Sequence, residues 1–133
     1  MEPASILVVD DDEAVRSVVV SCLQKAGHRV WQAKTGEEAV SHLGRCDLDL
    51  VITDYIMPGM DGLSLATKSV MLDPQRPVMM MTGFADAGVS GPLKSVLIFD
   101  WIAKPFRIDE FRLRVQRAIK QRRSLLNVDV GQA

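Results

Sequence analysis

The sequence predicts an α/β domain with a five-stranded parallel sheet and helices on both of its faces. Three observations predict this fold class. Short apolar runs alternate with amphipathic helical patterns from one end of the chain to the other. The apolar runs are nearly continuous, which is typical of strands buried on both faces. At 133 residues the chain can also bury the core of one such domain without disulfides.

The first half of the chain contains the clearest patterns. Residues 6–9 form an apolar run, and apolar residues spaced by three and four then continue to Gly27, which indicates a helix. Arg29–Ala33 favours a second strand, Gly36–Leu43 a short helix, and residues 48–53 a third strand. Strands and helices therefore alternate, as right-handed crossovers between parallel strands require.

The second half repeats this alternation with one irregular segment. A helix over 62–71 is followed by a fourth strand over 77–81, whose methionines we interpret as core residues. Glycine and proline interrupt residues 85–96, so any helix there should be short or irregular. Residues 97–103 predict a fifth strand, and the chain then enters a last helix. The apolar face of that helix contains Ile108, Phe111, Val115, Ala118 and Ile119.

Polar groups follow the strands at the points where the strands end. They are Asp10, Asp11 and Asp12 after the first strand, Asp54 after the third, Thr82 after the fourth, and Lys104 with Pro105 after the fifth. In the flavodoxin-like strand order 2-1-3-4-5, the first and third strands are neighbours, so their carboxylates converge. Carboxylates about 4 Å apart repel by about 4 kcal/mol at an effective dielectric of 20. A bound Mg²⁺ would remove that repulsion and could bridge to a phosphate.

Each of these residues also has an ordinary structural interpretation when taken alone. Asp12 and Asp61 are good helix N-caps, and Lys104 could be a solvated charge. It is the joint placement of complementary groups at several strand ends that indicates a site. The sequence contains no glycine-rich phosphate loop, nucleophile elbow or histidine-rich metal motif, which argues against nucleotide hydrolases, serine hydrolases and zinc enzymes.

The complete pattern resembles the receiver domain of bacterial two-component response regulators. The matching stretches are ILVVDDDEAVR, DLVITDYIMPGMDG, VMMMTG and WIAKPF. The resemblance implies that Asp54 is a phosphoacceptor, served by a histidine kinase or histidine phosphotransfer protein. It implies that Asp11, Asp54 and the backbone carbonyl of Ile56 bind Mg²⁺, while Asp10 acts through water. Thr82 and Lys104 would bind the phosphoryl oxygens.

The same resemblance implies a switch and an output face. Trp101, Pro105 and Phe106 occupy switch and output positions, with Lys104-Pro105 as a cis peptide bond. The face made by residues 85–96, the fifth strand and the last helix would be remodelled by phosphorylation, control a downstream protein and be available for a dimer. Trp101 departs from the usual Tyr or Phe, which predicts an atypical output surface. Ile56 and Phe84 flank the pocket without a group to hold an attacking water, which predicts a long-lived phosphoryl group.

Three alternatives remain at this point. The chain could be a receiver-like module that binds its partner without phosphorylation. It could be a Mg²⁺-dependent phosphatase with an aspartyl nucleophile, although Ile56 stands where a second acid would be needed. It could bind DNA through the last helix, although no second recognition helix accompanies it. Our expectation is a signalling phosphoacceptor rather than an enzyme, without direct contact to nucleic acid.

Composition and charge add expectations about location and about single residues. The net charge is −1, the longest apolar run is too short for a membrane span, and the first strand begins too early for a signal peptide, so we expect a cytoplasmic protein without membrane contact. Cys22 and Cys46 are interpreted as reduced, buried residues. His28, His42 and the basic residues of the last helix are expected at the surface. We assign residues 1–123 to the receiver domain and 124–133 to a tail or linker stub.

Overall fold

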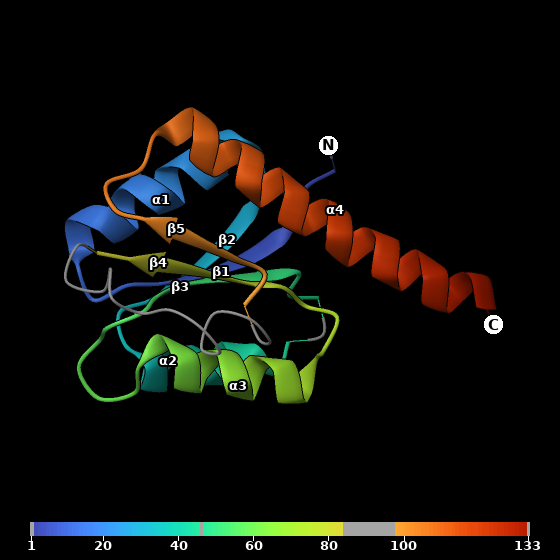
Figure 1. Ribbon diagram of the computed structural model, residues 1–133, viewed down its shortest axis with the longest axis horizontal. Helices are drawn as coiled ribbons and strands as arrows, with labels where there is room; N and C mark the ends of the chain where they lie inside the picture. The colour runs from blue at the N-terminus through green and yellow to red at the C-terminus, as the bar shows by residue number, and fades with distance from the viewer. Residues whose placement is uncertain (1, 46, 84–97, 133) are drawn as a thin grey trace.

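The computed structural model describes residues 2–45, 47–83 and 98–132, with no side-chain description from 128 onward. Five parallel strands form one sheet in the order β2-β1-β3-β4-β5 (Figure 1). The strands are β1 Ser5–Val9, β2 Arg29–Ala33, β3 Leu50–Asp54, β4 Val78–Thr82 and β5 Asp100–Ala103. The predicted fold class and strand order are confirmed.

Helices cover both faces of the sheet. In Figure 1, α1 (Glu13–Lys25) and α4 (Ile108–Gln132) lie on one face, and α2 (Gly36–Leu43) and α3 (Gly62–Leu72) lie on the other. Two buried clusters fill the spaces between these layers, one beneath α1 and α4 and the other beneath α2 and α3. The three central strands are buried over nearly their whole length, as their continuous apolar runs predict.

Side-chain caps fix where three helices begin. Asp12 accepts hydrogen bonds from the backbone N–H groups of Ala14 and Val15 at the start of α1. Thr35 caps α2, and Asp61 caps α3 by accepting from the N–H of Ser64 at 2.8 Å. These caps satisfy backbone donors that have no partner within the helix. They also determine where the loops that leave β1 and β3 must turn.

The strand ends differ slightly from the sequence-based bounds. Asp54 and Thr82 are the last residues of β3 and β4 rather than the first residues after them, and β5 begins only at Asp100. Their polar side chains therefore stand on regular strand backbone. Residues 84–97 lie outside the described part of the chain, so the predictions for Phe84 and for the irregular segment 85–96 stay predictions.

Two predictions of surface exposure are wrong. His28 is buried, and its Nδ1 accepts a hydrogen bond from the N–H of Ala4 at 3.0 Å. Arg122 is 3% exposed and forms a two-point ion pair with Asp73, at 3.0 and 2.9 Å. Both side chains are polar, but specific partners far away in the sequence make their burial possible.

The C-terminal end of the chain continues the last helix. α4 runs through residues 124–132, where the sequence suggested a tail or linker stub, and this end extends past the sheet in Figure 1. Cys22 is buried, as expected, while Cys46 lies outside the described residues. Within the described part of the chain, no helix combines the length and apolarity needed to cross a membrane.

Candidate phosphoacceptor and metal site

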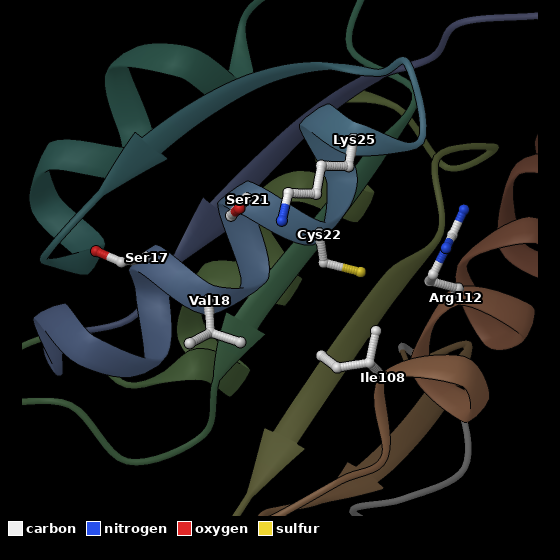
Figure 2. A pocket seen from close by; sticks show the side chains of 7 residues that line it. All are labelled: Ser17, Val18, Ser21, Cys22, Lys25, Ile108 and Arg112. Atoms are coloured by element: carbon white, nitrogen blue, oxygen red, sulfur yellow. The ribbon is translucent and has the colours of Figure 1, made fainter.

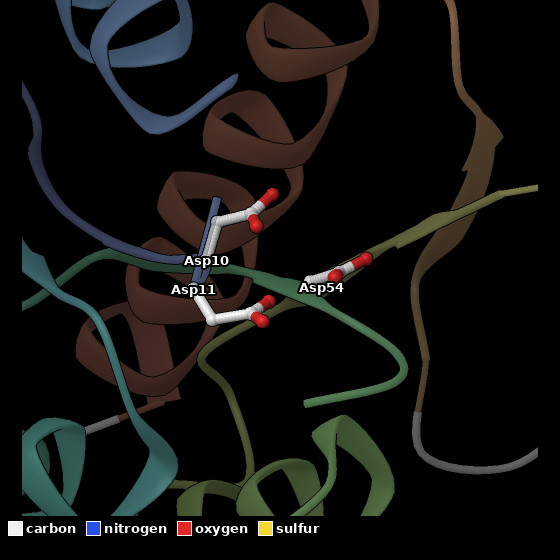
Figure 3. Close-up of side chains that lie close together, drawn as sticks. All are labelled: Asp10, Asp11 and Asp54. Atoms are coloured by element: carbon white, nitrogen blue, oxygen red, sulfur yellow. The ribbon is translucent and has the colours of Figure 1, made fainter. Parts of the chain in front are cut away.

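Three carboxylates meet at the carboxyl end of the sheet. Asp10 and Asp11 follow β1, and Asp54 ends β3, the strand that pairs with β1. One oxygen from each carboxylate can be chosen so that all three lie within 4.8 Å of one another (Figure 3). Asp10 is fully buried, Asp54 is 8% exposed and Asp11 is exposed. The predicted convergence of these residues is confirmed by their geometry.

Lys104 places its ammonium between two of the carboxylates. Its Nζ lies 2.9 Å from Oδ2 of Asp10 and 3.0 Å from Oδ1 of Asp54. The residue follows β5, and its backbone N–H donates to the carbonyl of Thr82 at the end of β4. Strands β4 and β5 therefore bring a cation to the carboxylates at the ends of β1 and β3.

Asp10 uses both carboxylate oxygens within the protein. Oδ1 accepts a hydrogen bond from the backbone N–H of Asp12 at 2.9 Å, and Oδ2 accepts one from the ammonium of Lys104. Each carboxylate oxygen has two lone pairs, so these two bonds use only part of the acceptor capacity of Asp10. That Asp10 acts through water stays a prediction, and the exposed carboxylate of Asp11 is open to a ligand.

Burial and mutual hydrogen bonding shift the pKa values of Asp54 and Lys104. Burial raises the pKa of Asp54, and the negative charge of Asp10 adds to this effect, although the hydrogen bond from Lys104 opposes it. For Lys104, burial lowers the pKa of the ammonium, but the hydrogen bonds to Asp10 and Asp54 outweigh burial and raise it. Lys104 is therefore firmly cationic beside a carboxylate whose charged form is disfavoured by burial.

The loop after β3 is held close to Asp54 by glycine and by α2. Gly62 packs so tightly that a Cβ atom there would collide with the carbonyl oxygen of Asp54 and lie 2.6 Å from Sδ of Met80. Glu37 on α2 accepts a hydrogen bond from the N–H of Met60 at 2.9 Å. Ile56, two residues after Asp54, is 57% exposed. The loop that would present its carbonyl is thus fixed from two sides.

The other predicted site residues lie around this centre. Thr82 ends β4, next to β3 and level with Ala103 of β5. Trp101 on β5 packs edge-on against Tyr55, with ring centroids 5.6 Å apart. The backbone carbonyl of Trp101 accepts a hydrogen bond from Arg114 on α4. The Lys104-Pro105 bond is cis, and Phe106 stacks on Phe111 of α4.

A groove between α1 and the start of α4 adjoins the site. It encloses about 420 Å³, and Figure 2 shows Val18 and Cys22 of α1 facing Ile108 and Arg112 of α4 across it. A second hollow, lined in part by Val18 and by Lys104, Pro105 and Phe106, continues it toward the carboxylates. Val18 and Ile108 are 53% and 42% exposed, which is high for aliphatic side chains.

Sequence reasoning missed two residues that brace the site. Arg16 donates to the carbonyl of Asp10 at 2.7 Å, and Glu37 holds the loop after β3. Neither residue stands at a strand end, where the polar groups of the predicted site lie. The signal available for Arg16 was its position one helical turn after the capping Asp12, which directs its side chain back toward the loop.

Comparisons with known proteins agree on one family. The model of the response regulator receiver domain matches residues 6–116. The C4-dicarboxylate transport transcriptional regulatory protein DctD of Rhizobium meliloti (strain 1021) is 34% identical over 92% of this chain and 26% of its own length. The response regulator receiver protein CpdR of Brucella abortus (strain 2308) is 30% identical over 86% of this chain and 95% of its own length.

A solved structure gives the same result. The receiver domain of NtrX from Brucella abortus matches with a TM-score of 0.79 and 30% identity, covering 86% of this chain and 98% of that one. The chain spans about a quarter of DctD and of the transcriptional regulator NtrC, but nearly all of CpdR. The similarity therefore concerns the domain that these proteins share.

Proposed function

Because this chain belongs to the response regulator receiver domain family, we propose that Asp54 accepts a phosphoryl group from a phosphohistidine of a histidine kinase or histidine phosphotransfer protein. One observation carries the proposal: Asp54 lies at the carboxyl end of the sheet, within a cluster that holds two further carboxylates and the ammonium of Lys104. Clusters of buried charges with perturbed pKa values gather preferentially at functional sites.

The transfer exchanges one bond to phosphorus for another. A carboxylate oxygen of Asp54 attacks phosphorus, the bond from phosphorus to the imidazole nitrogen breaks, and that nitrogen keeps the electron pair. Lys104 moves from Asp54 to a phosphoryl oxygen while it keeps Asp10. The hydroxyl of Thr82 donates to a second phosphoryl oxygen. The donor set fits Mg²⁺, with Asp11, Asp54 and the carbonyl of Ile56 as ligands. When bound, the ion offsets the negative charge of the phosphoryl group.

The phosphodonor would dock in the groove between α1 and α4. The donor histidine has to reach Asp54, and this groove leads to Lys104 through the hollow beside Pro105 and Phe106. Exposed Val18 and Ile108 offer apolar contacts, while Lys25 and Arg112 at its rim suit a partner with acidic side chains.

The output would be a protein contact in the cytoplasm. The ring of Trp101 contacts Tyr55, which directly follows β3, and the carbonyl of Trp101 accepts a hydrogen bond from Arg114 on α4. A shift at the phosphorylation site would therefore have a packed route to the face that contains α4. The face made by β5, Pro105, Phe106 and α4 would bind a downstream protein or a second copy.

The direct test is intact-protein mass after incubation with acetyl phosphate and Mg²⁺. We expect a gain of one phosphoryl group in the wild-type protein, and no gain in Asp54→Asn or with a chelator. Asp47→Asn serves as the matched control because Asp47 is an exposed carboxylate away from the site. Absence of any gain, also with phosphohistidine donors, would favour a module that binds its partner without phosphorylation. Continuous phosphate release from many small phosphate esters would favour the phosphatase alternative.

A further inference from the structure

Arg16 bonds to the peptide that joins the two aspartates after β1. Its Nη1 donates to the carbonyl oxygen of Asp10 at 2.7 Å. Its Nε donates to Oε1 of Gln32 on β2 at 3.0 Å. One half-buried guanidinium on α1 therefore ties the turn between β1 and α1 to the neighbouring strand.

This bond bears most directly on Asp11. The carbonyl of Asp10 and the N–H of Asp11 belong to one planar peptide unit that also contains Cα of Asp11, so holding the carbonyl restrains the backbone from which the Asp11 side chain leaves. The carboxylates of Asp10 and Asp54 have partners of their own. Among the described residues, no hydrogen bond or ion pair holds the carboxylate of Asp11. Its placement therefore depends on its backbone.

We propose that Arg16 is a positioning residue for the divalent-cation site, acting through the Asp10–Asp11 peptide with Gln32 as its anchor. The inference deepens the proposed function and rests on its metal site. Arg16 touches a backbone carbonyl rather than a carboxylate, so its contribution is to the geometry of the ligands. Groups that orient metal ligands typically change affinity by about tenfold or more when they are removed.

The sign of the effect separates geometry from charge. Arg16 carries a positive charge near a cation site, so electrostatics alone predict that Arg16→Ala binds Mg²⁺ more tightly. A positioning role predicts the opposite, because the Asp11 peptide loses its constraint. Arg16→Lys keeps the charge but replaces the planar two-point fork with a single ammonium. Any loss of affinity in that variant is therefore geometric.

The experiment is a calorimetric titration of the purified chain with MgCl₂, together with urea unfolding in a chelator. We expect Arg16→Ala to weaken Mg²⁺ binding about tenfold and Arg16→Lys to lie between it and the wild type. Gln32→Ala, which changes no charge, should also weaken binding. The double variant should bind no worse than Arg16→Ala, because the two residues act as one unit.

Arg29→Ala is the matched control. Arg29 also joins β2 to β1, through a bond from its Nε to Oγ of Ser5 at 3.1 Å, but it does so at the opposite end of the two strands. It should leave Mg²⁺ affinity unchanged. If Arg16→Ala does not fold, Gln32→Ala and Arg16→Lys still test the proposal.

The outcomes separate this inference from the function on which it rests. Unchanged or tighter Mg²⁺ binding in Arg16→Ala, or unchanged binding in both Gln32→Ala and Arg16→Lys, would overturn the positioning role alone. A wild-type chain that shows no Mg²⁺ binding at millimolar concentrations would overturn the metal site and this inference together. Lower stability of Arg16→Ala with unchanged affinity would make Arg16 a purely structural residue.

Discussion

Lys104 and Asp54 form an ion pair of 3.0 Å across the carboxyl edge of the sheet. Both side chains are largely buried, at 20% and 12% exposure, so water screens the pair only weakly. The ammonium also holds Asp10, which has no exposure at all. Without a phosphoryl group, Lys104 is thus the principal cation that compensates two buried carboxylates within the described residues.

Replacing this cation should make the fold dependent on metal. Lys104→Met leaves Asp10 and Asp54 without their ammonium, and we expect it to lower the free energy of unfolding by about 1–3 kcal/mol in a chelator. Millimolar Mg²⁺ should restore more stability to this variant than to the wild type. Urea unfolding with and without MgCl₂ measures both effects.

Lys120→Met is the control for this substitution because Lys120 is exposed on α4. It should leave stability within about 0.5 kcal/mol of the wild type, as surface changes usually do. Equal stability of Lys104→Met and Lys120→Met in chelator would show that the two carboxylates do not need Lys104.

Asp54 should lower the stability of the metal-free protein at neutral pH. Its folded-state pKa is raised, chiefly by burial, above its value in the unfolded chain. A carboxyl group with a raised pKa contributes stability below the unfolded-state pKa of about 3.9, and this contribution is lost as the pH rises through the folded-state pKa. Asp54→Asn, which removes the buried charge, should therefore be more stable than the wild type at pH 7.

The advantage of Asp54→Asn should shrink as the pH falls toward 4, where the wild-type carboxyl becomes protonated. Thermal unfolding in chelator between pH 4 and pH 8 measures the difference. A difference that is independent of pH, or that grows on acidification, would contradict the raised pKa.

Gly62 is expected to be essential for the shape of the site. A Cβ atom there would overlap the carbonyl oxygen of Asp54 and approach Sδ of Met80 at 2.6 Å. Gly62→Ala should cost about 2–3 kcal/mol of stability and reduce phosphorylation by acetyl phosphate. Gly44→Ala is the control, since a Cβ atom there meets nothing within 4 Å and its φ of −76° suits alanine. Similar stabilities of the two variants would refute the close packing.

The phosphoryl group is expected to be long-lived because Ile56 cannot hold a water for attack on phosphorus. Ile56→Asn adds an amide that can, and we expect it to accelerate loss of the phosphoryl group about tenfold. Val40→Asn provides the comparison, as Val40 is another exposed aliphatic residue, on α2. The decay of the phosphorylated mass with time gives both rates, and rapid loss from the wild type would contradict the prediction.

The sequence was sufficient to predict the centre of the site. Asp10, Asp54 and Lys104 stand at or just after strand ends, and in a parallel sheet all such ends lie on one edge. Continuous apolar runs identified the strands, and the meeting of Asp10 with Asp54 then followed from the flavodoxin-like strand order, which the structure confirms.

Burial of polar residues could not be predicted in the same way. His28 and Arg122 looked like surface residues because their neighbours in the sequence offer no partner. Their partners, Ala4 and Asp73, lie 24 and 49 positions away and are brought to them by the fold. The role of Arg16 escaped for a different reason: its partner Asp10 lies only six positions away, but the bond is to a backbone carbonyl, which residue type does not reveal.

The two-point ion pair of Arg122 has a consequence for motion. It fixes α4 to Asp73, in the segment between α3 and β4, and the helix then continues for ten further residues to Gln132. At 1.5 Å per residue this segment is about 15 Å long. A tilt of about 10° at Arg122 would move its end by about 3 Å, from the same helical rise. The residues of α4 that follow Arg122 would therefore amplify a tilt of the helix at the point where Arg122 holds it.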